Sequence, residues 1–126
     1  MVDGESNATT LIKEALDRIV GITIFTFNDA MLAWKHYAEN IDKYVLIISD
    51  LRIAKRDGFE LLKKVKDVNP YVRTILIGDH EVKNDGDYQK YMRKEIINKF
   101  IQKPIGITEL YYEVDTQLHA YAMNMI

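Results

Sequence analysis

Cysteine is absent from this chain of 126 residues. Disulfide bonds and zinc–thiolate sites are therefore excluded, and the composition is compatible with a reducing cytosol. Long apolar runs are missing too, so no segment has the length needed to span a membrane, and no charged-then-apolar leader is present. We therefore expect a soluble, cytoplasmic protein that does not associate with membranes.

An excess of basic charge is also missing, because 17 Lys and Arg residues are set against 19 Asp and Glu residues, for a net charge of -2. Nucleic-acid binding needs a basic excess on one face, and the lysine-rich stretches at 63–66 and 90–94 are short and flanked by acids. The six glycines are scattered and form no phosphate-binding loop. These absences argue against nucleic-acid, nucleotide and flavin partners.

What is present favours one compact domain over residues 1–126, since 48% of the residues are hydrophobic and 29% are charged. Hydrophobic periodicity predicts helices at 9–20, after Asn28-Asp29, at about 59–66, at 88–97 and from Gly106. It predicts strands at 22–27, 44–50, 72–77 and 98–102. The polar segment 79–87 is predicted to be a loop. This alternation predicts an α/β fold with a doubly wound parallel sheet and right-handed crossovers.

Two of the predicted strands end on charged residues of opposite sign. The apolar run from Tyr44 ends at Asp50, and the run from Phe100 is followed by Lys103. The carboxyl ends of parallel strands meet at one edge of a sheet, where open α/β folds bind ligands. We therefore expect the carboxylate of Asp50 and the ammonium of Lys103 to face a common crevice.

The segments around these two residues have a familiar order. Ser49-Asp50-Leu51-Arg52 is followed by Asp57-Gly58-Phe59-Glu60-Leu61-Leu62 and later by Lys103-Pro104. Nearly the whole chain thereby resembles the response-regulator receiver domain (CheY-like) of two-component signalling. The resemblance implies a flavodoxin-like (βα)5 fold and a cis peptide bond before Pro104. It also implies a first strand that is mostly missing, because only Met1-Val2 precede Asp3.

The same resemblance implies a phosphoryl-transfer site. Asp50 would be the phosphoacceptor towards a phosphohistidine or a small acyl phosphate, and Lys103 would pair first with Asp50 and then with a phosphoryl oxygen. The implied cofactor is Mg²⁺, with Asp3, Asp50, the backbone carbonyl of Arg52 and, as an open choice, Glu5 as its ligands. Gly4 stands where the family has its second acid and cannot ligate a metal.

The implied switch positions are Gly78 and Phe100. In the family a Ser or Thr at the first position bonds the phosphoryl group, and the aromatic ring at the second turns inward in response. Gly78 has no hydroxyl, so this coupling is expected to be weak or absent. Asp79 adds negative charge beside the site, and Ile53-Ala54 replaces the usual Met-Pro of the phosphoacceptor loop.

Three explanations stay open for the short first strand. The natural start could lie upstream of Met1, a partner could supply a strand, or the domain could be degenerate. An unpaired neighbouring strand would expose backbone groups, which makes an intermolecular solution, including a homodimer, one alternative.

Two functions remain as hypotheses. The first is a stand-alone receiver that takes a phosphoryl group from a histidine kinase and signals by contact with an output protein. The alternative is a pseudo-receiver, an interaction module that is not phosphorylated. Neither is an enzyme beyond self-catalysed phosphorylation and dephosphorylation. His80, near the predicted crevice, is a candidate modulator of dephosphorylation, whereas His36 and His119 are expected to be partly solvated helix residues.

Overall fold

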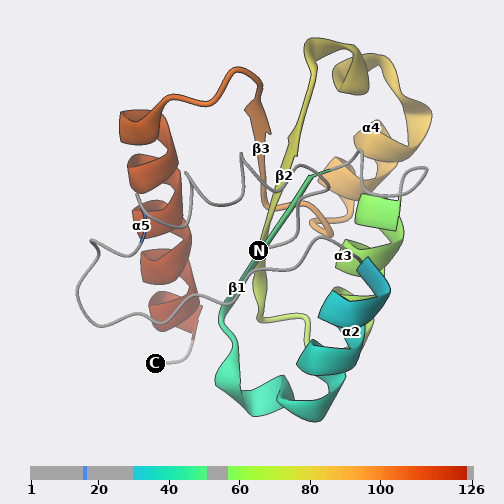
Figure 1. The fold of residues 1–126 in the computed structure, drawn as a ribbon, viewed down its shortest axis with the longest axis vertical. Coiled ribbons are helices and arrows are strands. Elements are labelled where there is room, and N and C mark those ends of the chain that lie inside the picture. Colours follow the sequence, from blue (N-terminus) through green and yellow to red (C-terminus); the bar gives the residue numbers. More distant parts are fainter. Residues whose placement is uncertain (1–15, 17–29, 51–56, 125–126) are drawn as a thin grey trace.

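The computed structural model describes residue 16, residues 30–50 and residues 57–124. In these ranges the elements are α2 (Ala30–Glu39), the 3-10 helix η1 (Ile41–Lys43), β1 (Leu46–Asp50), α3 (Asp57–Val68), β2 (Arg73–Gly78), the 3-10 helix η2 (His80–Asn84), α4 (Gly86–Arg93), β3 (Lys99–Gln102) and α5 (Ile107–Asn124). Figure 1 shows α5 on one side of the strands and α2, α3 and α4 on the other.

The described strands form a parallel sheet in the order β1-β2-β3. Ile48 of β1 lies opposite Ile75 of β2, and Leu76 of β2 lies opposite Phe100 of β3. The predicted parallel sheet with helices on both faces is thereby confirmed. Its carboxyl edge, where β1, β2 and β3 all end, collects the residues that follow each strand.

Side chains of β2 alternate between the two faces of the sheet, as the period of two in a strand requires. Ile75 and Ile77 pack with Leu110 and Val114 of α5, whereas Leu76 packs with the helices on the opposite face. A strand that is buried on both faces is apolar without interruption. This explains why the run Ile75-Leu76-Ile77 contains no polar position.

Helices α2 and α3 pack through small residues. Ala30 and Ala33 of α2 are buried against Leu61 and Val65 of α3. Tyr37 lies in the same cluster, and its hydroxyl is buried without a hydrogen-bond partner among the described residues. Burial, and secondarily the negative charge of Asp42, raise the pKa of Tyr37 above its ordinary value.

The segment 79–87, predicted to be a loop, is mostly helical, so that prediction was wrong. It contains η2 and the first turn of α4. Asp85 is the N-cap of α4, since its carboxylate accepts hydrogen bonds from the backbone N–H groups of Asp87 at 2.8 Å and Tyr88 at 3.4 Å. The many polar residues of this segment include a helix cap as well as solvent-facing side chains.

Helix α4 also ends earlier than the predicted 88–97, at Arg93. Glu95 adopts a left-handed conformation with φ of 59°. Its N–H bonds the carbonyl of Met92, and the N–H of Ile96 bonds the carbonyl of Tyr91, which is the Schellman arrangement of a helix end. Ile96 and Ile97 therefore do not continue the helix, although their apolar character suggested it.

The other predicted bounds agree more closely. The three described strands and the start of α5 fall within two residues of their predicted positions, and α3 extends further at both ends. On α5, Val114 is buried, whereas Tyr111, Leu118 and Tyr121 are only partly buried. The strand at 22–27, the truncated first strand and, apart from the buried Leu16, the helix at 9–20 lie outside the described residues.

Candidate functional site

The carboxyl edge of the sheet brings the two predicted charged residues together. Asp50 is the last residue of β1 and is 2% exposed. The ammonium of Lys103 lies 2.5 Å from its carboxylate. A buried carboxylate is stable only when it is paired or well hydrogen-bonded. The structure therefore places a strongly anchored charge pair at the edge where this class of sheet binds ligands.

The backbone holds Lys103 against the end of β2. Its N–H donates to the carbonyl of Gly78 at 2.8 Å, and the Lys103–Pro104 peptide bond is cis. Gly78 is buried at the end of β2 and offers no side-chain group to the site. The side of the site formed by β2 therefore consists of backbone, as the sequence led us to expect.

Phe100, the second predicted switch position, is buried on the α4 side of β3. Its ring meets that of Tyr88 edge-on, with the centroids 5.2 Å apart, and the ammonium of Lys83 lies 6.0 Å above the ring. Burial raises the pKa of Tyr88 above its ordinary value. Tyr88 and Lys83 were not predicted as neighbours of Phe100, because only the tertiary structure brings η2 and α4 onto β3.

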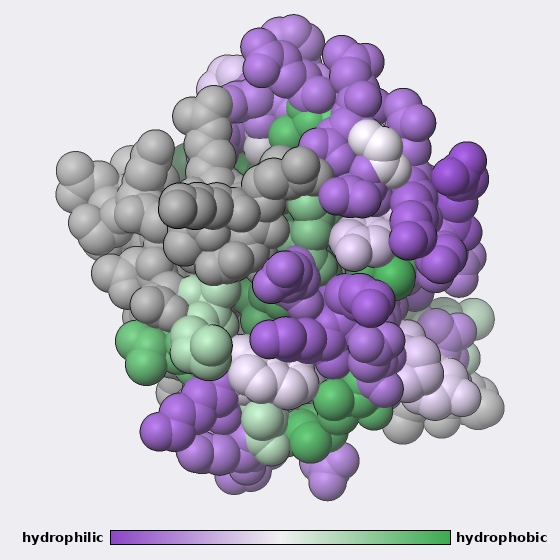
Figure 2. Space-filling model, turned by 90° about the vertical axis from the view of Figure 1, so that its right-hand side faces the viewer, coloured by the Kyte–Doolittle hydropathy of each residue, from purple (hydrophilic) through white to green (hydrophobic). Residues whose placement is uncertain are grey.

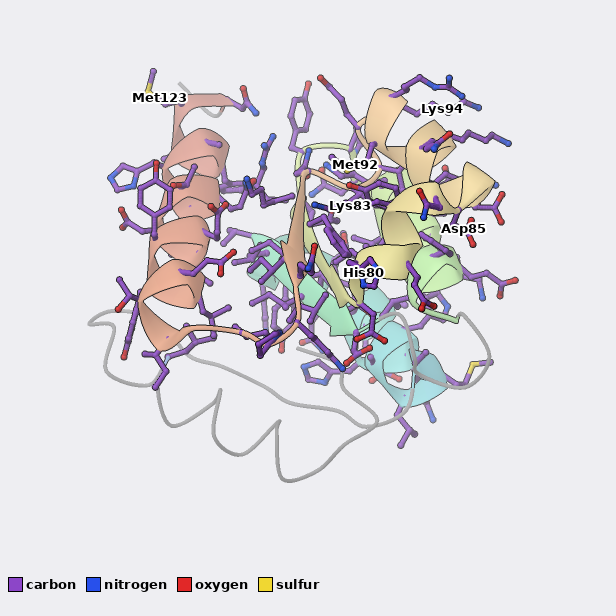
Figure 3. The ribbon with its side chains drawn as sticks, turned by 90° about the horizontal axis from the view of Figure 1, so that it is seen from above. His80, Lys83, Asp85, Met92, Lys94 and Met123 are labelled. Atoms are coloured by element: carbon purple, nitrogen blue, oxygen red, sulfur yellow. The ribbon has the colours of Figure 1, made fainter. Side chains whose placement is uncertain are left out.

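The short helix η2 lies directly after β2 at the carboxyl edge. Seen from above, His80 and Lys83 of η2 lie between α4 and β3 (Figure 3). In a 3-10 helix residues three apart project in the same direction, so both side chains leave η2 on one side. His80 is exposed. The structure thus places the predicted modulator on the first turn beyond the strand that ends at Gly78.

The other two histidines, His36 and His119, have partners elsewhere in the structure. His36 of α2 is hydrogen-bonded through Nε2 to the hydroxyl of Tyr44. His119 of α5 is exposed, and its Nδ1 lies 3.5 Å from the carboxylate of Asp115 one turn earlier. Their partners are on or beside their own helices, in agreement with the prediction that they are partly solvated helix residues.

Several predicted site residues fall outside the described part of the chain. These are Asp3, Gly4, Glu5, Arg52 and the Ile53-Ala54 pair. Within residues 30–50 and 57–124 there is no group of three or more His, Asp or Glu side chains arranged to hold a metal. Of the predicted Mg²⁺ ligands the structure therefore describes Asp50 alone, whose carboxylate oxygens are the type that Mg²⁺ prefers.

A comparison with models of protein families identifies the chain. The model of the response regulator receiver domain matches residues 1–115. The chain belongs to this family. Receiver domains are signalling modules, and as a family they bind Mg²⁺ at an acidic pocket and interact with histidine kinases and output domains. The resemblance derived from the segments around Asp50 and Lys103 is thereby confirmed at the level of the family.

Solved structures give the same fold. A receiver domain protein from Clostridium thermocellum has a TM-score of 0.84 at 20% identity, with 97% of this chain and 94% of that chain covered. The receiver domain of an HD domain-containing protein from Pseudomonas fluorescens Pf-5 has a TM-score of 0.83 at 22% identity, covering 98% and 88%. A CheY-like receiver from Methanospirillum hungatei JF-1 reaches 0.82 at 18%, covering 98% and 94%. No curated protein sequence matches the chain.

Two further observations concern the hydrophobicity of the helices and of one face of the molecule. No helix in the described part of this receiver domain is long and apolar enough to cross a membrane. Figure 2 views the side of the molecule on which α2, α3 and α4 lie, and hydrophilic side chains predominate there. The exposed side chains of α3 and α4 include both signs of charge, such as Glu60, Lys63, Asp87 and Lys90.

Proposed function

We propose that residues 1–126 act as a receiver domain in a two-component phosphorelay. Asp50 would accept a phosphoryl group from a histidine kinase in the cytoplasm, and output would follow by contact with another protein. The observation that carries the proposal is the ion pair between the buried Asp50 and the partly buried Lys103 at the carboxyl edge.

The geometry of this pair supports the following chemistry. A carboxylate oxygen of Asp50 attacks phosphorus, a new P–O bond forms, and the bond to the donor's nitrogen or acyl oxygen breaks with its electron pair leaving on the donor. Lys103 then exchanges the Asp50 carboxylate for a phosphoryl oxygen, so its positive charge stays paired throughout. The ammonium thereby orients the carboxylate before transfer and stabilises the anionic product afterwards.

Mg²⁺ prefers oxygen ligands, and the residues predicted to surround it offer carboxylates and a backbone carbonyl. Asp50 would hold it together with Asp3, the backbone carbonyl of Arg52 and, as an alternative to the missing second acid at Gly4, Glu5. The ion supplies positive charge that reduces repulsion between the carboxylate and the incoming phosphoryl oxygens. Because Gly4 provides no oxygen, we expect weaker Mg²⁺ binding than a complete acidic pair would give.

The test is the intact mass of the protein after incubation with acetyl phosphate and Mg²⁺. We expect the gain of one phosphoryl group in the wild type and none in Asp50→Asn, because the amide is not a nucleophile. Asp67→Asn is the matched control, since Asp67 is an exposed aspartate on α3, and it should be phosphorylated like the wild type. An unmodified wild-type protein that is shown to be folded would overturn the proposal.

A specific observation favours a second candidate, the pseudo-receiver. Phe100 is buried beneath Lys83 and beside Tyr88, so side chains of η2 and α4 already surround its ring. Gly78 has no hydroxyl with which to link a phosphoryl group on Asp50 to that ring. In this alternative the surface formed by α4 and β3 has one conformation, and it binds its partner constitutively.

The two candidates differ in how α4 responds to treatment with acetyl phosphate and Mg²⁺. We compare backbone amide NMR spectra with and without acetyl phosphate and Mg²⁺, in the wild type and in Gly78→Thr. A pseudo-receiver predicts that the amides of residues 86–93 do not shift in the wild type. Shifts of these amides on phosphorylation of the wild type would contradict it and favour the switching receiver.

A further inference from the structure

A lysine of η2 lies across an aromatic ring of the core. Lys83 is an exposed residue, whereas Phe100 of β3 is only 9% exposed. The ammonium of Lys83 lies over the Phe100 ring, 6.0 Å from its centroid. Seen from above the carboxyl edge, Lys83 lies between α4 and β3 (Figure 3). A side chain that extends from the surface therefore covers a buried ring.

The backbone of η2 is held in place beside this ring. Val82 is buried in the same apolar cluster as Phe100. The N–H of Val82 donates to the carbonyl of Asp79 at 3.1 Å, and the side-chain amide of Gln89 on α4 donates to the carbonyl of Lys83 at 3.2 Å. The main chain of Lys83 is thereby fixed between the core and α4, and its side chain extends from a defined point.

The face of the Phe100 ring suits a cation. The planes of the Phe100 and Tyr88 rings are inclined at 68°, so Tyr88 meets Phe100 at an angle and does not stack on it. The face of an aromatic ring is electron-rich and attracts an ammonium group, while the methylene stem of a lysine covers apolar surface. Among residues 30–50 and 57–124 no carboxylate forms an ion pair with Lys83. The contact with the ring is therefore the one that orients this ammonium.

The end of β2 contributes no side chain that could hold the ring. Leu76 lies opposite Phe100 in the sheet, and β2 ends two residues later at Gly78. The next element along the chain is η2, which contains Lys83. The position of the Phe100 ring is thus controlled from the segment that follows β2 and not from the last residue of the strand.

We propose that Lys83 is a lid that holds the ring of Phe100 inside the cluster. The ammonium attracts the face of the ring, the methylene stem covers it, and the ring turns towards solvent when Lys83 moves away. The conformation of the surface formed by α4 and β3 is thereby set by a residue of η2. Lys83 is a positioning residue, since it acts through Phe100, and this role does not depend on whether Asp50 accepts a phosphoryl group.

The first experiment tests the contact in the unmodified protein. Protons that lie over the face of an aromatic ring are shifted upfield, so ¹H–¹³C NMR spectra of the lysine side chains report the position of Lys83. We expect the ε-methylene protons of Lys83 to lie upfield of those of Lys90, an exposed lysine of α4. The sample contains no phosphoryl donor, so failure here is distinct from failure of Asp50 to be phosphorylated.

The second experiment tests what the contact does. Relaxation-dispersion NMR on ¹³C-labelled phenylalanine rings measures the share of Phe100 rings turned out of the cluster. Lys83→Met keeps a long apolar side chain but removes the charge, and it should raise that share about two- to fivefold, as expected for the loss of an exposed cation–π contact. Lys83→Arg keeps the charge and should leave the share close to the wild-type value.

Lys90→Met is the matched control, because it removes a positive charge from the neighbouring helix without uncovering the ring. It should leave the share of outward rings unchanged. Loss of the Phe100 signals in Phe100→Leu identifies them among those of the four phenylalanines. Circular dichroism checks that each variant is folded.

Two results would overturn the proposal. One is an ε-methylene shift of Lys83 equal to that of Lys90, because the side chain would then not lie over the ring. The other is an equal share of outward rings in the wild type and in Lys83→Met, including none detected in either, because the cluster would then hold Phe100 without the ammonium. An upfield shift of Lys83 together with a larger outward share in Lys83→Met alone supports it.

Discussion

Charged side chains in this receiver domain differ in how their burial is compensated. Asp50 is paired with Lys103 at 2.5 Å, and the buried Glu113 of α5 lies 3.7 Å from the ammonium of Lys99. Lys66 instead has a backbone carbonyl as its hydrogen-bond partner, with Arg73 nearby. Removing a charge from water without a close opposite charge is unfavourable. Lys66 is therefore the residue at which we expect pH to alter stability.

The direction in which pH changes the stability follows from the pKa of Lys66 in the folded and unfolded states. The pKa of Lys66 is about 8 in the folded protein and about 10.5 in the unfolded chain. Between these values the unfolded chain holds more protons, so raising the pH stabilises the folded state. We expect Lys66→Met to be more stable than the wild type at pH 7, with the difference shrinking as pH rises from about 8 to about 10.5.

Urea unfolding at a series of pH values, followed by the fluorescence of the single Trp34, measures this difference. Tyr37, Tyr44 and Tyr88 also titrate at alkaline pH, with pKa values raised by burial, but they are present in both proteins and cancel in the comparison. Lys63→Met is the matched control and should show no such trend. A constant difference between wild type and Lys66→Met across this range would contradict the prediction.

At the scale of elements, α4 shows how a short helix is fixed by its ends. Asp85 caps its first turn, and the hydrogen bonds of Glu95 and Ile96 close its last turn. Beyond it, Thr74 and Asn98 tie β2 to β3, since Asn98 Oδ1 accepts from the backbone N–H of Thr74 at 2.9 Å. No residue of α4 is fully buried, but Tyr88, Tyr91 and Met92 pack against the cluster that includes Phe100. The position of α4 over Phe100 therefore depends on these side chains together with the contacts at its ends.

The helix end at Glu95 contains a residue that is poorly suited to its conformation. A φ of 59° costs a residue with a Cβ atom roughly 1–2 kcal/mol, and glycine avoids this cost but loses more entropy on folding. We expect Glu95→Gly to raise the free energy of unfolding by about 0.5–1 kcal/mol. Chemical denaturation at pH 7 measures the change.

The control for this substitution is Glu95→Gln, which removes the charge but keeps the Cβ atom. It separates the conformational effect from the loss of the carboxylate near Lys66. If Glu95→Gly is no more stable than Glu95→Gln, the left-handed conformation does not limit stability at this helix end.

At the scale of the whole molecule, the sheet separates two kinds of contact. On the α5 face, Arg73 contacts Gln117 and Lys99 contacts Glu113, beside an apolar cluster that includes Ile75. On the opposite face the contacts around Phe100 are mainly aromatic and apolar. Both of these polar contacts involve the first residue of a strand, at the amino end of the sheet. The pair of Asp50 and Lys103 lies at the opposite, carboxyl edge.

Much of this arrangement could be predicted without coordinates. The run Tyr44–Asp50 and the run that leads to Lys103 predict two buried strands, and alternation with helices predicts that the strands are parallel. A parallel sheet has one carboxyl edge, so the approach of Asp50 to Lys103 follows from topology. Hydrophobic periodicity is local and strong in such segments, and for that reason the strands and α3 were close to their predicted bounds.

The ends of α4 could not be predicted in the same way. Periodicity assigned Ile96 and Ile97 to the helix, because their apolar side chains fit a helical pattern. Their apolar side chains instead pack in the cluster around Leu76 and Phe100. Local pattern cannot distinguish a residue that continues a helix from one that closes it and enters the core.

The sequence by itself determined the receiver family, the parallel sheet and the proximity of Asp50 to Lys103. These properties depend on the order of short segments and on hydrophobic alternation, which are written along the chain. Only the tertiary structure decided that Lys83 and Tyr88 enclose Phe100 and that Arg73 stands beside Lys66. Contacts of this kind join residues of different elements, and their energies depend on burial and distance, neither of which exists until the elements have packed.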